Sequence, residues 1–169
     1  MNVKQNFRRI AAAAALTLAA AGAAQAQTIA AVTAVGNFVV GPALTVVGGM
    51  TTPLFANAAG QRFIVHFAAE CAVSAPAGNT TANTDVDILV LNPANVVVAV
   101  LAPTGGNLGV FCSADGSAGL PGFQSNAVIA VGGAGLPAGT YRVQVRARLN
   151  SGFAGFPASY GERTLIVTR

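Results

Sequence analysis

The feature that most constrains the fold is the strict alternation of side chains in residues 140–149. The apolar members are Tyr141, Val143, Val145, Ala147 and Leu149, and the polar members between them are Arg142, Gln144, Arg146 and Arg148. Successive side chains of a β-strand point to opposite faces, whereas a helix would mix the two groups on every face. The segment is therefore predicted to be a strand with one buried and one solvated face.

Similar extended segments recur along the chain between turn-forming residues. We expect strands at 27–35, 38–40, 43–52, 62–73, 85–92, 96–101, 125–131, 140–149 and 163–168, with loops at 103–124 and 150–161. Gly, Pro and Asn separate them, and no amphipathic helical pattern follows residue 26. Eight or nine strands at this spacing predict an all-β fold, an antiparallel β-sandwich of jelly-roll or immunoglobulin-like type.

Residues 1–26 have the order of a secretory signal peptide. Lys4, Arg8 and Arg9 precede the uncharged run 10–24, and Ala24-Gln25-Ala26 is a small-x-small cleavage site. A retained anchor is the alternative, but a spanning helix needs about 20 apolar residues. We expect cleavage after Ala26, leaving one domain of residues 27–169 in the periplasm or outside a bacterial cell.

The net charge of +4 depends on this leader. Residues 27–169 hold six arginines against five acidic residues and no lysine, so the basic pI is largely a property of the targeting segment. Nucleic acid is therefore not an expected partner. No run after residue 26 is long enough to span a membrane without Gly, Pro or polar interruption.

Two cysteines, Cys71 and Cys112, remain after cleavage. In an oxidising compartment such a pair most simply forms one disulfide. Free or metal-bound thiols are the alternative, although two Cys and the single histidine, His66, cannot complete a four-ligand zinc site without carboxylates. On a strand interior, His66 is interpreted as structural.

Residues 85–167 contain three short sequence motifs. They are Asp85–Pro93 (DVDILVLNP), Leu136–Val145 (LPAGTYRVQV) and Thr164–Val167 (TLIV). In these motifs the chain resembles the bacterial pre-peptidase C-terminal domains, although Ala94-Asn95 replaces the glycine usual in their first hairpin turn. The resemblance implies a jelly-roll-like sandwich that serves as an accessory binding or stability module, and some of these domains bind calcium.

Two sets of charged residues are candidate binding sites. Asp85 and Asp87 share one strand face, and with Asp115 they could supply carboxylates to calcium; a solvated pair, or partners for the arginines, is the alternative. Arg142, Arg146 and Arg148 could hold a polyanion by bidentate contacts, or could simply keep a sheet face soluble. The aromatic residues of the late loop could stack on sugars or cover the core: Phe153, Phe156 and Tyr160.

The function expected from these observations is that of an exported, non-enzymatic binding or structural module. Its partner would be a cell-surface polysaccharide or another secreted protein, with no cofactor other than calcium. One alternative is a self-assembling subunit of the chaperone–usher pilin type, with residues 27–35 as the donated strand. The other is a calcium-dependent carbohydrate-binding module. Ser117 lacks the glycine pattern of a nucleophile elbow, so the sequence does not favour an enzyme.

Overall fold

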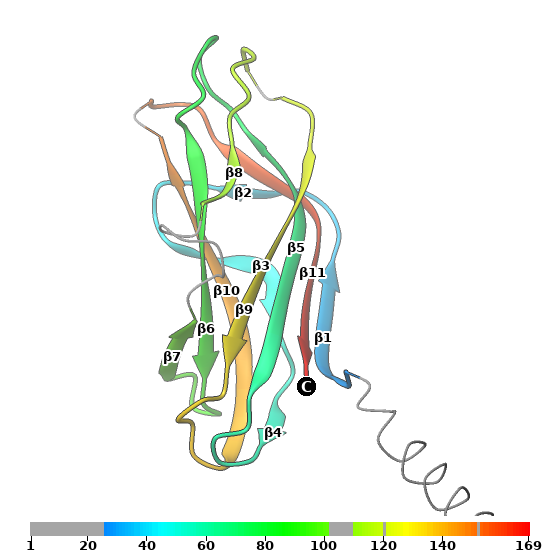
Figure 1. The fold of residues 1–169 in the computed structure, drawn as a ribbon. Coiled ribbons are helices and arrows are strands. Elements are labelled where there is room, and N and C mark those ends of the chain that lie inside the picture. Colours follow the sequence, from blue (N-terminus) through cyan, green and yellow to red (C-terminus); the bar gives the residue numbers. More distant parts are fainter. Residues whose placement is uncertain (1–25, 102–109, 120, 152) are drawn as a thin grey trace, which may run out of the picture.

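Every regular element in the described part of the chain is a β-strand (Figure 1). The computed structural model describes residues 26–101, 110–119, 121–151 and 153–169. The predicted signal peptide lies outside the described residues except for Ala26. Within the described ranges, no helix is long and apolar enough to cross a membrane.

The described ranges contain eleven strands, more than the eight or nine predicted. They are β1 (Thr28–Ala34), β2 (Phe38–Val40), β3 (Thr45–Thr51), β4 (Phe55–Asn57), β5 (Phe63–Val73), β6 (Asn83–Leu91), β7 (Val97–Leu101), β8 (Val110–Ser113), β9 (Gln124–Gly132), β10 (Gly139–Asn150) and β11 (Ala158–Thr168). The additional strands are β4 and β8, which are too short for alternation to reveal them.

The last strand begins earlier than the sequence predicts. Alternation indicated a strand from Arg163 and a loop over 150–161, but β11 starts at Ala158. The pairing of β11 with β5 shifts register between Tyr160 and Arg163. An extra residue in a strand interrupts the period-two pattern, so the buried Ala158 and Tyr160 did not appear as part of the same strand.

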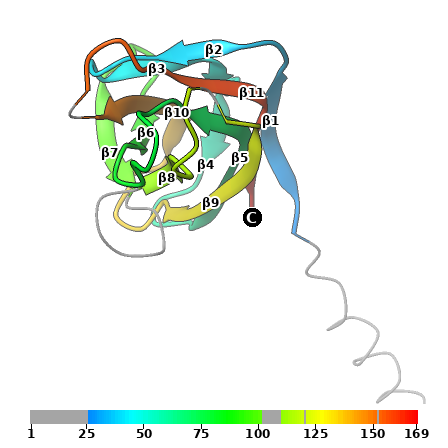
Figure 2. The same cartoon turned by 90° about the horizontal axis from the view of Figure 1, so that it is seen from above.

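The strands form two antiparallel sheets, which curve toward each other around the core (Figure 2). Sheet A has the order β1-β11-β5-β9, with β2 continuing along β11 beyond β1. Sheet B has the order β3-β10-β6-β7, with β4 beyond β3 and β8 beyond β7. The eleven strands therefore fill eight positions. The pairs β1 and β2, β3 and β4, and β7 and β8 each share one position. When the eight positions are numbered in chain order, sheet A reads 1-8-3-6 and sheet B reads 2-7-4-5, which is the strand order of a jelly roll. The predicted fold class is confirmed.

The segment considered for strand donation has a partner in its own chain. Residues Thr28–Ala34 pair with β11 from Thr168 to Arg163, and the backbones of Gln27 and Arg169 exchange two hydrogen bonds of 3.0 Å. Donation of this strand to another subunit would require β1 to leave sheet A.

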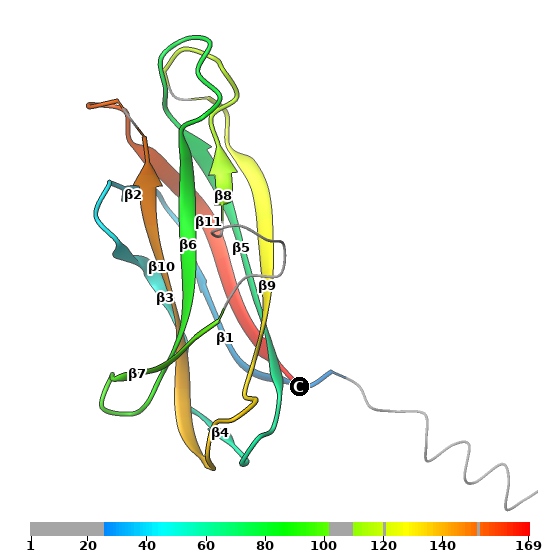
Figure 3. The same cartoon turned by 60° about the vertical axis from the view of Figure 1, so that its left-hand side comes forward.

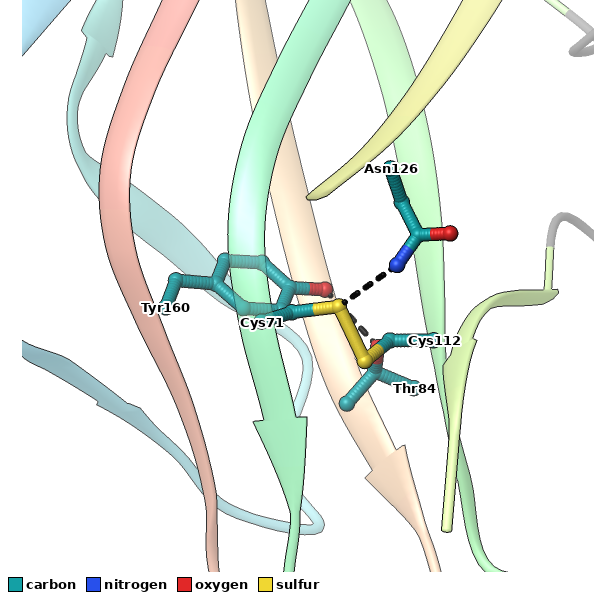
Figure 4. Close-up of a disulfide and its surroundings, with 5 residues drawn as sticks. All are labelled: Cys71, Thr84, Cys112, Asn126 and Tyr160. Atoms are coloured by element: carbon teal, nitrogen blue, oxygen red, sulfur yellow. Dashed lines mark hydrogen bonds between the residues drawn. A yellow bond between two sulfur atoms is a disulfide. The ribbon is translucent and has the colours of Figure 1, made fainter. Parts of the chain in front are cut away.

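The core lies between the inner faces of the sheets, where a disulfide joins them. Cys71 on β5 and Cys112 on β8 are bonded, with 6.3 Å between their Cα atoms, which confirms the predicted pairing (Figure 4). Beside it, the hydroxyl of the fully buried Tyr160 donates to Thr84 Oγ1 at 2.9 Å. Burial raises the pKa of Tyr160 above its ordinary value. This end of the sandwich is thus tied by a covalent bond and a buried hydrogen bond.

Arg163 on β11 points into the sandwich, where it ties sheet A to sheet B. Its side chain is 7% exposed. Its Nε donates to the carbonyl oxygen of Gly48 on β3 at 2.8 Å, and its Nη1 donates to those of Gly36 and Gly161 at 2.8 and 2.7 Å. The guanidinium also lies 5.7 Å from the ring centre of Phe38. Burial lowers the pKa of Arg163, but arginine stays protonated in proteins.

Two glycines of β3 make room for this arginine. A Cβ atom on Gly48 would lie 3.0 Å from the ring of Phe38 and 3.4 Å from the guanidinium of Arg163. Gly49 has a φ of +77°, and a Cβ atom there would lie 2.7 Å from that of Ala34. Only glycine lets β3 approach β1 so closely without strain.

We predict that removing the disulfide as the pair C71A/C112A lowers the free energy of unfolding by about 4 kcal/mol, because the unfolded chain regains the freedom of a loop of 41 residues. Urea unfolding followed by circular dichroism measures the change. A loss below about 1 kcal/mol would show that the core holds the sheets together without the covalent link.

We predict that Arg163→Met destabilises the fold by on the order of 3 kcal/mol, because it leaves three carbonyls without their donor inside the sandwich. Arg163→Lys should lose much of the same energy, since an ammonium lacks the planar fork that reaches all three oxygens. Thermal or urea unfolding compares the two variants. Full stability in the lysine variant would contradict this prediction, because it would show that a positive charge stabilises the fold without the planar guanidinium.

Candidate functional site

A hollow lies at one end of the sandwich, where the two sheets meet. It is formed by the turn from β2 to β3 and the loop from β10 to β11, which lie near each other in Figures 1 and 2. Its volume is about 600 Å³. It is lined by Val39, Val40, Gly41, Pro42, Leu149, Ser151, Phe153, Ala154, Gly155, Phe156 and Pro157. We refer to it as the end pocket.

Backbone hydrogen bonds hold both walls of the end pocket in place. The N–H of Leu149 donates to the carbonyl oxygen of Gly41 at 2.7 Å, which joins the end of β10 to the β2–β3 turn. The N–H of Ser74 donates to the carbonyl oxygen of Pro157 at 3.0 Å, which ties the second wall to the segment after β5. The hydroxyl of Ser151 accepts from the N–H of Phe153 at 3.1 Å, a local turn that sets the direction of the loop.

Among its described residues, the lining of the end pocket is mostly apolar and carries no ionisable side chain. Val40 and Leu149 are buried, whereas the ring of Phe153 is 42% exposed. Such a lining suits an uncharged ligand that presents an apolar face, because a charged group would lose its hydration there without a partner.

The three aromatic residues singled out in the late loop have different positions. Phe153 and Phe156 line the end pocket, as binding residues would. Tyr160 is fully buried on β11, where its ring packs against Phe67 and Phe111 with centres 6.4 and 5.6 Å away. The second pocket wall, around Gly41 and Pro42, carried no signal in the sequence beyond that of a turn.

The arginine row lies on the outer face of sheet B, opposite two aspartates. Strands β10 and β6, which run side by side in Figure 3, place Arg146 opposite Asp87 and Arg148 opposite Asp85. The charged atoms of these pairs are 3.0 and 3.1 Å apart. Arg142 forms no ion pair within the described residues. Two of the three arginines predicted to bind a polyanion are therefore paired within the protein.

The three aspartates considered for calcium are not gathered in one site. Asp85 is 6% exposed and accepts hydrogen bonds from Arg148 and Asn150. Asp115 accepts from the hydroxyl and the N–H of Ser117 at 2.5 and 2.8 Å, and the hydroxyl bond is the main cause of its lowered pKa. The described ranges contain no group of three or more His, Cys, Asp or Glu side chains that could hold a metal ion. Calcium binding stays a prediction.

No protein-family model and no curated protein matches the chain. Two solved structures of infectious bursal disease virus, of the Gx and Gt strains, are similar with TM-scores of 0.43 and 0.27. Their identities to this chain are 11% and 13%, over 86% and 85% of its length. The matches cover 32% and 39% of the viral chains, so this chain spans well under half of the structures it matches.

We predict that the double change D85N/D87N raises retention on heparin, because it removes the carboxylates that neutralise Arg146 and Arg148. The salt concentration at elution should increase over that of the unchanged protein and fall again when R142S, R146S and R148S are added. Equal elution of all variants would show that this face does not bind polyanions.

Proposed function

We propose that this chain is an exported, non-catalytic binding module that holds an uncharged, apolar-faced ligand in the end pocket. The observation that carries the proposal is a hollow of about 600 Å³ lined by apolar side chains, with the half-exposed Phe153 on its lining. Small-molecule sites typically enclose roughly 300–1,000 Å³ and are mostly apolar with a few polar groups.

Export rests on the order of charge, apolar run and cleavage site in residues 1–26, and the Cys71–Cys112 disulfide supports it. In this location the ligand would be an extracellular or periplasmic compound. A saccharide fits this chemistry if its C–H face lies on Phe153, because its hydroxyls would then face solvent rather than the apolar lining.

The arrangement of reactive groups favours binding over catalysis. Among the described lining residues, Ser151 alone carries a hydroxyl, and this hydroxyl is engaged with the backbone of Phe153. His66 lies on β5 and faces outward from sheet A, so it is not part of the lining. A serine without a neighbouring base is a weak nucleophile.

We predict that Phe153→Ala weakens binding of the uncharged fluorescent probe N-phenyl-1-naphthylamine about tenfold, because a contact worth about 1.4 kcal/mol is lost. Probe fluorescence, titrated with and without competing neutral oligosaccharides, measures the affinity. Displacement by an oligosaccharide would identify sugar as the ligand class.

Phe123→Ala is the matched control, since Phe123 is 41% exposed but does not line the end pocket. It should leave the probe affinity unchanged. If Phe123→Ala weakened binding as much as Phe153→Ala, or if neither did, the probe would not be bound in the end pocket and the proposal would fail.

A further inference from the structure

The outer face of sheet A is uncharged over its centre. On β5 the outward residues Ile64, His66, Ala68 and Glu70 alternate with core residues, and Arg62 directly precedes the strand. The register places Ile166 of β11 and Ile129 of β9 beside His66, and Val131 of β9 beside Ile64. Ile64, Ile129 and Val131 are 39%, 42% and 49% exposed. The middle of this face therefore carries no charge, and its polar groups include the imidazole of His66 and the hydroxyls of Thr164 and Thr168, which the register places beside Ala68 and Ile64.

Sheet B differs, because its outer face carries the ion pairs Arg146–Asp87 and Arg148–Asp85. An antiparallel sheet with one face in the core normally presents a polar face to water. The centre of sheet B follows this rule with paired charges, although Val46, Val97 and Val100 are exposed on its outer strands, whereas the centre of sheet A carries no charge. An exposed apolar sheet face of this kind is typical of an interaction surface.

The charges at the two ends of this face are opposite. Arg62 is exposed at one end of β5, and Glu70 lies at the other end. His66 is four residues from each, so a two-fold axis through His66 would bring Arg62 of one copy to Glu70 of a second copy. An antiparallel pairing of two such faces therefore matches opposite charges twice, which is the self-complementarity that a two-fold interface requires.

The acidic end also contains a hollow suited to a side chain. A depression of about 270 Å³ is lined by Thr33, Ala68, Ala69, Glu70, Ser125, Asn126, Glu162, Arg163 and Thr164. The register shift in β11 places the N–H of Glu162 3.4 Å from the carboxylate of Glu70. Glu70 and Glu162 therefore both contribute carboxylates to the lining of this hollow. Arg163 directs its guanidinium inward to three carbonyls, so the hollow keeps a net negative charge.

We propose that the outer face of sheet A binds a second copy of this chain across a two-fold axis at His66, with Arg62 of each copy in the acidic hollow of the other. The apolar centres, around Ile64 and Ile166, would pack against each other. Arginine suits the hollow because its planar guanidinium can bond two carboxylate oxygens at once.

The size of the face indicates a weak dimer. Four strands about 4.8 Å apart and eight residue steps of about 3.3 Å give a face of about 500 Å². Two such faces bury on the order of 1,000 Å², at the low end for specific protein interfaces. Packed sheets cross at about 30°, so the ends of the two β5 strands would lie apart from each other. The side chain of Arg62 is long enough to span the distance to the hollow of the second copy.

Sedimentation velocity of the purified protein over a concentration series tests the proposal. We expect a reversible monomer–dimer equilibrium, with Ile64→Asp raising the dissociation constant about tenfold or more. Val100→Asp is the matched control, since Val100 is 62% exposed on β7 of sheet B and should leave the constant unchanged. A protein that stays monomeric at its solubility limit, or a dimer disrupted by Val100→Asp and not by Ile64→Asp, would overturn the proposal.

Charge reversal tests the contact at each end. Arg62→Glu alone and Glu70→Arg alone should each weaken the homodimer, because both end contacts then join like charges. An equal mixture of the two variants should dimerise about as well as the unchanged protein, because every contact in the mixed dimer again joins opposite charges. No recovery in the mixture would overturn the arrangement. If Glu70→Arg does not fold, Glu162→Arg serves the same test from an exposed position.

Discussion

The buried guanidinium of Arg163 is the interaction on which the arrangement of the sandwich edges depends. It bonds Gly36 between β1 and β2, Gly48 in β3 and Gly161 in β11, so it joins two segments of sheet A to β3 of sheet B, with which neither of them pairs. A charge this deeply buried is tolerated because carbonyl oxygens take the place of water. Gly48 and Gly49 provide the space that a side chain at either position would fill.

Arg163 lines the acidic hollow, and it bonds the two carbonyls that flank one wall of the end pocket in sequence. The residues from Val39 to Pro42, one wall of the end pocket, lie between Gly36 and Gly48, and both of these carbonyls bond Arg163. Gly161 precedes Glu162, which lines the acidic hollow on the opposite face of sheet A. A single side chain thus positions a pocket wall on one side and a carboxylate on the other.

Alternation predicted strands such as β5 and β10, because each has one face in the core and one toward water. It did not reveal β4 or β8, which have three and four residues, nor the start of β11, which a register shift between Tyr160 and Arg163 separates from the rest of the strand. The disulfide followed from an even cysteine count. The end pocket could not be predicted from the sequence, because its walls are brought together by the hydrogen bond between Leu149 and Gly41, which lie far apart in sequence.

The charged residues proposed as binding sites show a second limit of prediction from sequence. Asp85 and Asp87 as carboxylate ligands, and Arg146 and Arg148 as polyanion ligands, were separate hypotheses because the pairing of β6 with β10 was unknown. The register places these residues opposite each other, so each set is the other's partner, an alternative that the sequence had left open.

The end pocket and the proposed dimer face can be used at the same time. Ala158 and Val73 pair at the pocket end of sheet A, beyond the level of Glu70. A second copy centred on His66 reaches from Arg62 to Glu70, so it leaves that end uncovered. The two pockets would then lie at opposite ends of the dimer. Two sites linked in one dimer would favour a repetitive ligand such as a polymer, because binding at one site raises the local concentration at the other.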